Sequence, residues 1–193
     1  MINLKAHRLI LASQSPRRKA LLKGLDVDFI TRSADIDEVY PDHLKAEEIP
    51  LYLAKQKAIA MQSELSDKDI LITADTIVWM NNKAINKPLN KEDAFKIISE
   101  LSSNQHSVYT GVQISTKQQT ISFFSETKVT FSHLTKSEIN YYLDKYQPFD
   151  KAGAYGIQEW IGYIGIEKIE GSYFNVMGFP VHQVYQKLKQ ILG

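Results

Sequence analysis

Residues 11–18 read LASQSPRR and decide how the N-terminal part of this chain folds. The run Arg8–Ala12, which overlaps the start of this stretch, is mostly apolar and typical of a short buried strand. Pro16 suits the first position of a short helix that Gly24 closes, and Ser15 suits the capping position before it. The stretch therefore predicts a strand, a tight polar turn and a helix whose free N–H groups face outward.

The start of this predicted helix is a candidate anion site. Ser13 and Ser15 supply hydroxyls, Arg17 and Arg18 supply guanidiniums, and the helix adds backbone N–H groups and its positive dipole end. This combination suits a chain of phosphates. The alternative is that the serines only cap the helix and the arginines are solvated, because neither glycine-rich phosphate fingerprint is present. These residues alone leave both interpretations open.

Composition limits the classes of function. The 193 residues, 44% hydrophobic and 23% charged, fit a globular protein with a substantial core, and we expect a single domain over 1–193. The net charge of +1 and the lack of a basic stripe argue against direct nucleic-acid binding. The absence of cysteine excludes thiolate metal sites, and the five scattered histidines disfavour zinc. With no apolar run of membrane-spanning length and no secretory segment, we expect no membrane partner and a cytoplasmic location.

Asp75 is the most informative single residue. It stands between the apolar strand segments Ile70–Ala74 and Ile77–Met80, and the turn residues Asn81 and Asn82 then predict a hairpin. A carboxylate between such segments is costly unless it is paired, hydrogen-bonded or bound to a metal. Carboxylates in these places are often functional.

Two further segments offer charged groups to the same site. The acidic loop Ala34–Pro41 has three carboxylates in four residues, which indicates either a solvated turn or a site for a hard cation. The pattern from Ile49 to Leu65 predicts an amphipathic helix. Lys55 and Lys57 lie off its apolar face, where either could reach a neighbouring cleft or remain solvated.

The rest of the chain alternates strand and helix patterns of a mixed α/β unit. Residues 149–158 combine small residues with a charged pair and a glutamine, which suits close approach of backbone to a ligand or a bulged strand. The other predicted elements are a strand at 27–31, a helix from Asn90 to Leu101, strands at 106–115 and 120–131, a helix with a capping box from Thr135 to Tyr146, strand-like sequence to Ile169, and a helix over Val181–Leu192.

Taken together, these segments resemble the Maf family of nucleoside triphosphate pyrophosphatases. The resemblance is carried by the joint order and spacing of motifs that are each weak alone. They are LASQSPRR at 11–18, Ile36–Glu38, Ala74–Val78, Lys87–Pro88, Thr110–Gly111, DKAGAYGIQ at 150–158, Gly171–Tyr173 and Gly178–Pro180.

The resemblance implies a mixed α/β fold with an elongated sheet flanked by helices and a nucleotide-binding cleft between two lobes. It also implies a homodimer that hydrolyses a nucleoside triphosphate to the monophosphate and pyrophosphate with Mg²⁺ or Mn²⁺. Within the family, the subgroup acting on dTTP and UTP carries the residues found here as Arg17, Thr76 and Gln158. These three are therefore the expected specificity residues.

The chemistry expected of such a site assigns the remaining roles. We expect Asp75 to be the general base on the attacking water and, with Glu38, a metal ligand. The triphosphate is expected to bind through a set of cations and hydroxyls, namely Ser13, Ser15, Arg18, Lys57 and Lys87.

Two other functions are weighed against this one. The sibling subgroup acts on 7-methyl-GTP, but it typically has Trp at the position of Arg17 and lacks the pattern from Lys151 to Gln158. A regulatory or binding role in septum formation, from which the family takes its name, is the other alternative. Failure to release pyrophosphate from any nucleotide would favour it.

Overall fold

The computed structural model describes residues 2–34 and 36–193, so Asp35 of the predicted acidic loop lies outside the described residues. Strands and helices alternate along most of the chain. The elements are β1 (Arg8–Ala12), α1 (Pro16–Lys23), β2 (Ile30–Arg32), α2 (Glu48–Met61), the 3₁₀ turn Gln62–Glu64, β3 (Asp69–Met80), β4 (Lys83–Ile85), α3 (Lys91–Leu101), β5 (Gln105–Ser115), β6 (Thr120–Phe131), α4 (Lys136–Tyr146), the 3₁₀ turn Ala152–Ala154, α5 (Trp160–Gly165), β7 (Ile166–Glu170), α6 (Tyr173–Val176) and α7 (Val181–Leu192).

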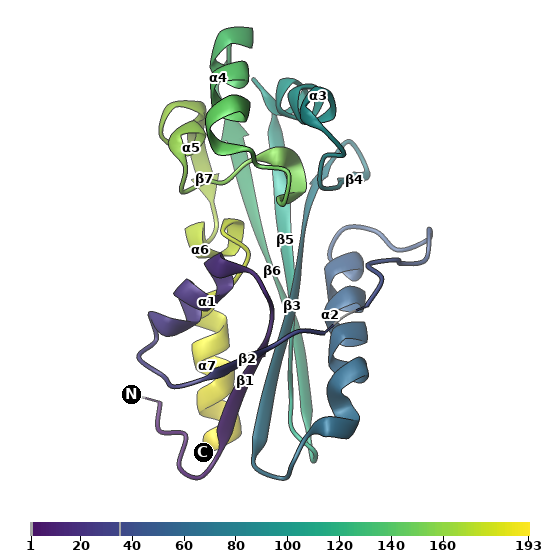
Figure 1. The fold of residues 1–193 in the computed structure, drawn as a ribbon, viewed down its shortest axis with the longest axis vertical. Coiled ribbons are helices and arrows are strands. Elements are labelled where there is room, and N and C mark those ends of the chain that lie inside the picture. The colour runs from purple at the N-terminus through teal and green to yellow at the C-terminus, as the bar shows by residue number, and fades with distance from the viewer. Residues whose placement is uncertain (1, 35) are drawn as a thin grey trace.

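The strands form one mixed sheet in the order β2-β1-β3-β5-β6-β7, with β4 paired to β3. β1 is parallel to both neighbours, and the other pairs are antiparallel. The long strands β3, β5 and β6 run the length of the molecule, with α2 on one side of them and α1 and α7 on the other (Figure 1). α3, α4 and α5 gather at the opposite end from the two termini. The predicted elongated mixed sheet flanked by helices is confirmed.

Four apolar clusters pack along the long sheet among the described residues, and the two largest are called here the two cores. One lies among α3, α4, α5 and the sheet and includes Val78, and the other lies among α1, α7 and the sheet and includes Ala74. Asp75 and Thr76 therefore fall between the cores on the same strand. These two polar residues of β3 therefore mark the place between the cores where a cleft opens.

Local signals set most element boundaries correctly. Ser15 caps α1 by accepting a hydrogen bond from the Arg18 N–H, and Asn90 caps α3 in the same way. Asn81 and Asn82 have φ of 52° and 58°, the left-handed values that a two-residue hairpin turn requires. The predicted bounds of β1 and α7 are also confirmed.

Three predicted elements are corrected. The first strand after α1 is Ile30–Arg32, and α2 ends at Met61 before a 3₁₀ turn. The bulged-strand alternative for 149–158 is wrong, and the strand-like sequence predicted up to Ile169 forms a strand only in β7, although residues 149–165 are rich in aromatic and β-branched residues. Gly153 has φ of 73°, which breaks extended pairing, and α5 then buries Ile161 in the first core. Tertiary packing overrides local propensity here.

Within residues 2–34 and 36–193, no helix combines the length and apolar character needed to cross a bilayer.

Candidate active site

A cleft of about 720 Å³ opens between the two cores. It is lined by the β1–α1 turn, one face of α2, the middle of β3, and the segments around 86, 150–158 and 176–178. All of the predicted site residues line it, namely Ser13, Ser15, Arg17, Arg18, Glu38, Lys57, Asp75, Thr76, Lys87 and Gln158. Residues that are distant in sequence are thus brought to one place, which leaves their individual roles as predictions.

Asp75 is paired with a lysine inside the cleft. Its Oδ1 lies 2.7 Å from the Lys57 Nζ, and the two residues are only 7% and 8% exposed. Lys57 lies on the buried face of α2, and Lys55 is exposed, which corrects the expectation that both flank the apolar face. Burial raises the pKa of Asp75, and the nearby charges of Lys57 and Arg18 oppose that rise. A carboxylate with these opposing influences is suited to accept a proton during a reaction.

Lys57 reaches Asp75 because α2 lies unusually close to β5. Gly111 is the register partner of Asp75, and a Cβ placed on it would lie 2.4 Å from the backbone of Pro50 and Leu51. Only a glycine allows this approach of helix to sheet. The Thr-Gly motif at 110–111 therefore positions the lysine on the neighbouring helix.

Glu38 joins the pair and extends it to the cleft mouth. Its carboxylate accepts from Lys57 Nζ and Lys87 Nζ, each at 2.8 Å. Burial acts to raise the pKa of Glu38, but the hydrogen bonds and charges of the two lysines lower it to about 2. Two carboxylates, Glu38 and Asp75, thus converge on one ammonium group.

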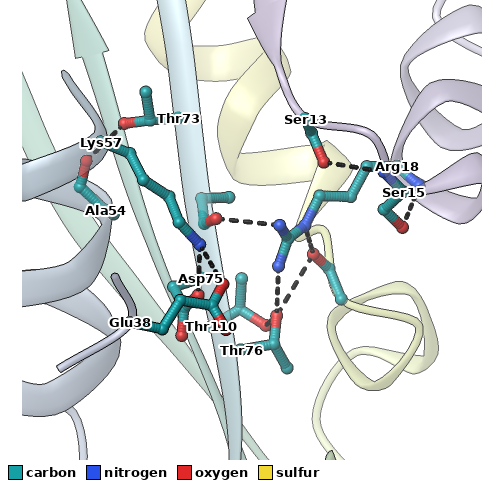
Figure 2. Close-up of polar contacts among 12 residues, drawn as sticks. Ser13, Ser15, Arg18, Glu38, Ala54, Lys57, Thr73, Asp75, Thr76 and Thr110 are labelled. Carbon is teal, nitrogen blue, oxygen red and sulfur yellow. Dashed lines mark hydrogen bonds and ion pairs between the residues drawn. The ribbon is translucent and has the colours of Figure 1, made fainter. Parts of the chain in front are cut away.

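Arg18 is largely committed to protein oxygens. Its Nε donates to the Gly178 carbonyl at 2.8 Å, one terminal nitrogen to the Ala74 carbonyl at 2.9 Å, and the other to Thr76 Oγ1 at 3.0 Å. Figure 2 shows Arg18 approaching β3 from α1 and Lys57 approaching from α2, with Asp75 and Thr76 between them. Arg18 therefore ties α1, β3 and the segment before α7 together.

Thr76 and the two serines also have structural partners. Thr76 Oγ1 lies 3.0 Å from Thr110 Oγ1 in addition to Arg18. Ser13 Oγ accepts from the Ser15 N–H at 3.2 Å, and Ser15 Oγ accepts from the Arg18 N–H at 3.4 Å. The capping interpretation is thus correct for Ser15, whereas Ser13 holds the turn before the helix and Arg18 is not a solvated charge. An anion site remains compatible with these contacts because both serines line the cleft.

Residues 8–191 match the family profile described as "Maf-like protein". The chain belongs to the Maf family. The predicted membership is therefore confirmed.

Relatives of this Maf chain match it over nearly its whole length. The dTTP/UTP pyrophosphatase of Parabacteroides distasonis is 55% identical over 188 residues and covers 97% of each chain. That of Bacteroides fragilis strain YCH46 is 50% identical over 192 residues, covering 99% of this chain and all of the relative. A solved structure described as a nucleoside-triphosphatase / dITP/XTP pyrophosphatase from Mycobacterium abscessus covers 66% of this chain and 74% of its own, with 12% identity and a TM-score of 0.36. That likeness is too distant to support a conclusion about this chain.

The Maf motif at 150–158 contributes two charged side chains to the cleft in addition to the predicted Gln158. Asp150 accepts from Arg17 at 3.2 Å and from Lys151 at 2.8 Å, and both Asp150 and Lys151 line the cleft. The sequence indicates only that this segment brings backbone close to a ligand or forms a bulged strand, and it assigns no separate role to Asp150 or Lys151. A signal for the role of this charged pair was its position two residues before Gly153, where the backbone turns sharply.

The residues of the cleft fit a divalent metal ion. Glu38 and Asp75 offer carboxylate oxygens, the ligands that Mg²⁺ prefers. In the part of the chain that the structure describes, no three His, Asp or Glu side chains gather closely enough to hold a metal alone. The remaining ligands would then be water and substrate phosphate, as is usual for Mg²⁺ at nucleotides.

Proposed function

We propose that this Maf-family protein hydrolyses dTTP and UTP, and modified pyrimidine nucleotides, to the monophosphate and pyrophosphate. The observation that carries the proposal is the buried Asp75 carboxylate, set in a cleft whose wall presents Lys57, Lys87 and Arg17. The activity is the one named for relatives about half identical over nearly the whole chain.

Asp75 acts as the general base in the proposed reaction. It takes a proton from a water molecule as the water oxygen forms a bond to the α-phosphorus. The bond from that phosphorus to the bridging oxygen breaks, and pyrophosphate leaves with the electron pair. Burial of Asp75 raises its pKa toward the range useful for proton transfer, and general-base catalysis contributes about 10²–10⁴-fold.

Glu38 and Asp75 would hold Mg²⁺ or Mn²⁺ together with the substrate. When bound, the cation supplies charge neutralisation at the phosphates. Lys57 and Lys87 exchange their contacts with Glu38 for phosphate oxygens, and the charges stay paired because phosphate is also an anion and Glu38 would hold the cation. The serine hydroxyls and the α1 N-terminus add neutral donors. Arg18 holds the start of α1 in place through its hydrogen bonds to the Ala74 carbonyl and Thr76.

Gln158 reads the pyrimidine with Arg17 and Thr76. The Gln158 Oε1 is buried and has no hydrogen-bond partner among the described residues. An acceptor left unpaired in a cleft wall is suited to the N3–H donor that uracil and thymine present and cytosine lacks. This orphan acceptor supports a pyrimidine dione as the substrate base.

The proposal extends to assembly and location. We expect a homodimer in the cytoplasm, and the exposed aromatic side chains Tyr163, Tyr173 and Phe174 are candidates for its interface. Light scattering after size-exclusion chromatography tests the dimer, and a monomer at micromolar concentration would contradict it.

A substrate panel tests the proposed function. Purified protein with Mg²⁺ is incubated with dTTP, UTP, 5-methyl-UTP, CTP and 7-methyl-GTP, and pyrophosphate and monophosphate are measured separately. We expect pyrophosphate from the first three at the highest rates. Fastest turnover of 7-methyl-GTP would favour the sibling activity, and no pyrophosphate from any nucleotide would favour a binding role.

A further inference from the structure

Lys151 places a second buried ammonium group in the cleft wall. Its side chain is only 10% exposed, and its Nζ lies 2.8 Å from Asp150 Oδ1 and 3.2 Å from Glu159 Oε1. Lys151 lines the same cleft as Gln158. A lysine held this firmly is not a solvated surface charge, and its ammonium group has a fixed position in the cleft wall.

The two carboxylates that hold Lys151 differ in how firmly they are fixed. Glu159 accepts a short hydrogen bond from the Tyr142 hydroxyl, and that hydroxyl accepts from the Gly156 N–H at 3.0 Å. Glu159 is also the residue before α5, yet it makes no side-chain cap bond to that helix. Its carboxylate is therefore committed to Tyr142 and Lys151.

Asp150 is the exchangeable partner. Its side chain is 61% exposed, and its second oxygen binds Arg17 across the cleft wall at 3.2 Å. An exposed carboxylate bridging two cations gives up little when another acceptor replaces it, because solvent weakens such ion pairs. A ligand oxygen can take its place beside Lys151 while Glu159 keeps the ammonium group in position.

The cleft cations thus form two groups, each around one carboxylate. Glu38 bridges Lys57 and Lys87 beside Asp75, where the reaction is proposed to occur. Asp150 bridges Arg17 and Lys151, on the segment that carries Gln158. The first group therefore serves the phosphates, and the second lies with the residues that read the base.

We propose that Lys151 is a further substrate-binding residue that donates a hydrogen bond to the C4 carbonyl of uracil or thymine, with Glu159 as its positioning residue. The inference rests on the proposed function, because it takes a pyrimidine nucleotide as the ligand. An ammonium group donates and cannot accept. It therefore favours a carbonyl at C4 and disfavours the amino group that cytosine carries there.

Binding of unreactive nucleotides tests this role without requiring turnover. Dissociation constants of the α,β-methylene analogues of UTP and CTP are measured by calorimetry for wild type, Lys151→Met, Glu159→Gln and the double variant. Lys151→Met alone leaves Glu159 buried and uncompensated and can impair folding, whereas the double variant removes both charges together. The matched control is Lys168→Met with Glu170→Gln, an exposed ion pair on β7.

In Lys151→Met and the double variant, binding of the UTP analogue is expected to weaken by about 10- to 100-fold, the loss of a hydrogen bond from a charged donor. Binding of the CTP analogue and the melting temperature of the double variant stay near wild type. Glu159→Gln alone shows a smaller loss in the same direction, and the control pair shows none.

Equal weakening for both analogues would overturn the inference, because Lys151 would then serve the shared triphosphate. Unchanged binding of both would overturn it as well. A wild-type protein that binds the analogues but releases no pyrophosphate from UTP would instead overturn the proposed function, and the binding comparison would still decide the role of Lys151.

Discussion

Replacing Gly111 with alanine should push α2 away from the sheet and lower the activity, although Gly111 is not one of the proposed catalytic residues. The new Cβ would lie 2.4 Å from Leu51 N and Pro50 C and 2.5 Å from Pro50 O, all of them backbone atoms. A side chain could rotate away, but a helix backbone must move as a unit. Overpacking costs about 1–3 kcal/mol even where side chains can adjust, so we expect a loss of about 3 kcal/mol for Gly111→Ala. At about 2–4 °C per kcal/mol, the melting temperature should fall by roughly 6–12 °C.

The same displacement should weaken the contact between Lys57 and Asp75, because Lys57 is carried by α2. The assay is thermal unfolding together with pyrophosphate release from UTP, measured well below the melting temperature of the variant. Gly24→Ala is the control, since Gly24 has helical φ and a Cβ there would meet no atom closer than 3.3 Å. If Gly111→Ala melted with the wild type and kept full activity, the tight approach of α2 would not be what positions Lys57.

Three further predictions concern charge and metal. Lys57→Met leaves Asp75 and Glu38 without their shared cation, so the free energy of unfolding should fall by about 3–5 kcal/mol and pyrophosphate release should drop sharply. A denaturation midpoint equal to that of the wild type would contradict this. Burial lowers the pKa of His106 to about 4, below its unfolded value near 6.5. The unfolded chain therefore binds a proton more readily, so the free energy of unfolding is at its full value above pH 6.5. It falls by up to about 3 kcal/mol as the pH falls toward 4. Unfolding of His106→Phe should depend less on pH across that window, and equal slopes for both proteins would refute the assignment. Chelation with EDTA should stop pyrophosphate release and added Mg²⁺ or Mn²⁺ should restore it, whereas undiminished release in metal-free buffer would exclude the proposed metal site.

Much of the fold was predictable because its signals are local. Ser15, Asn90 and the Thr135 capping box each start a helix through contacts within a few residues. The segment 149–165 was not predictable in this way. Its aromatic and β-branched residues favour a strand, and only the positive φ of Gly153 and the burial of Ile161 against distant helices make it a turn and a helix.

The sequence could predict which side chains line the cleft but not how they contact one another. The sequence could place an acid at Asp75 because a carboxylate inside an apolar strand requires a partner. It could not show that the partner is Lys57, because that contact depends on the helix-to-sheet distance at Gly111. Nor could it show that Arg18 donates its hydrogen bonds to two backbone carbonyls and Thr76, or that Lys151 forms an ion pair with Glu159.

The rate of pyrophosphate release from UTP by Asp75→Asn, compared with wild type in Mg²⁺, tests the central claim most directly. Asparagine keeps the size of the side chain but cannot take a proton from water. We expect the rate to fall by about 10²–10⁴-fold while the variant stays folded and still binds the α,β-methylene analogue of UTP. A folded Asp75→Asn protein that releases pyrophosphate within a few-fold of the wild-type rate would contradict the assignment of Asp75 as the general base.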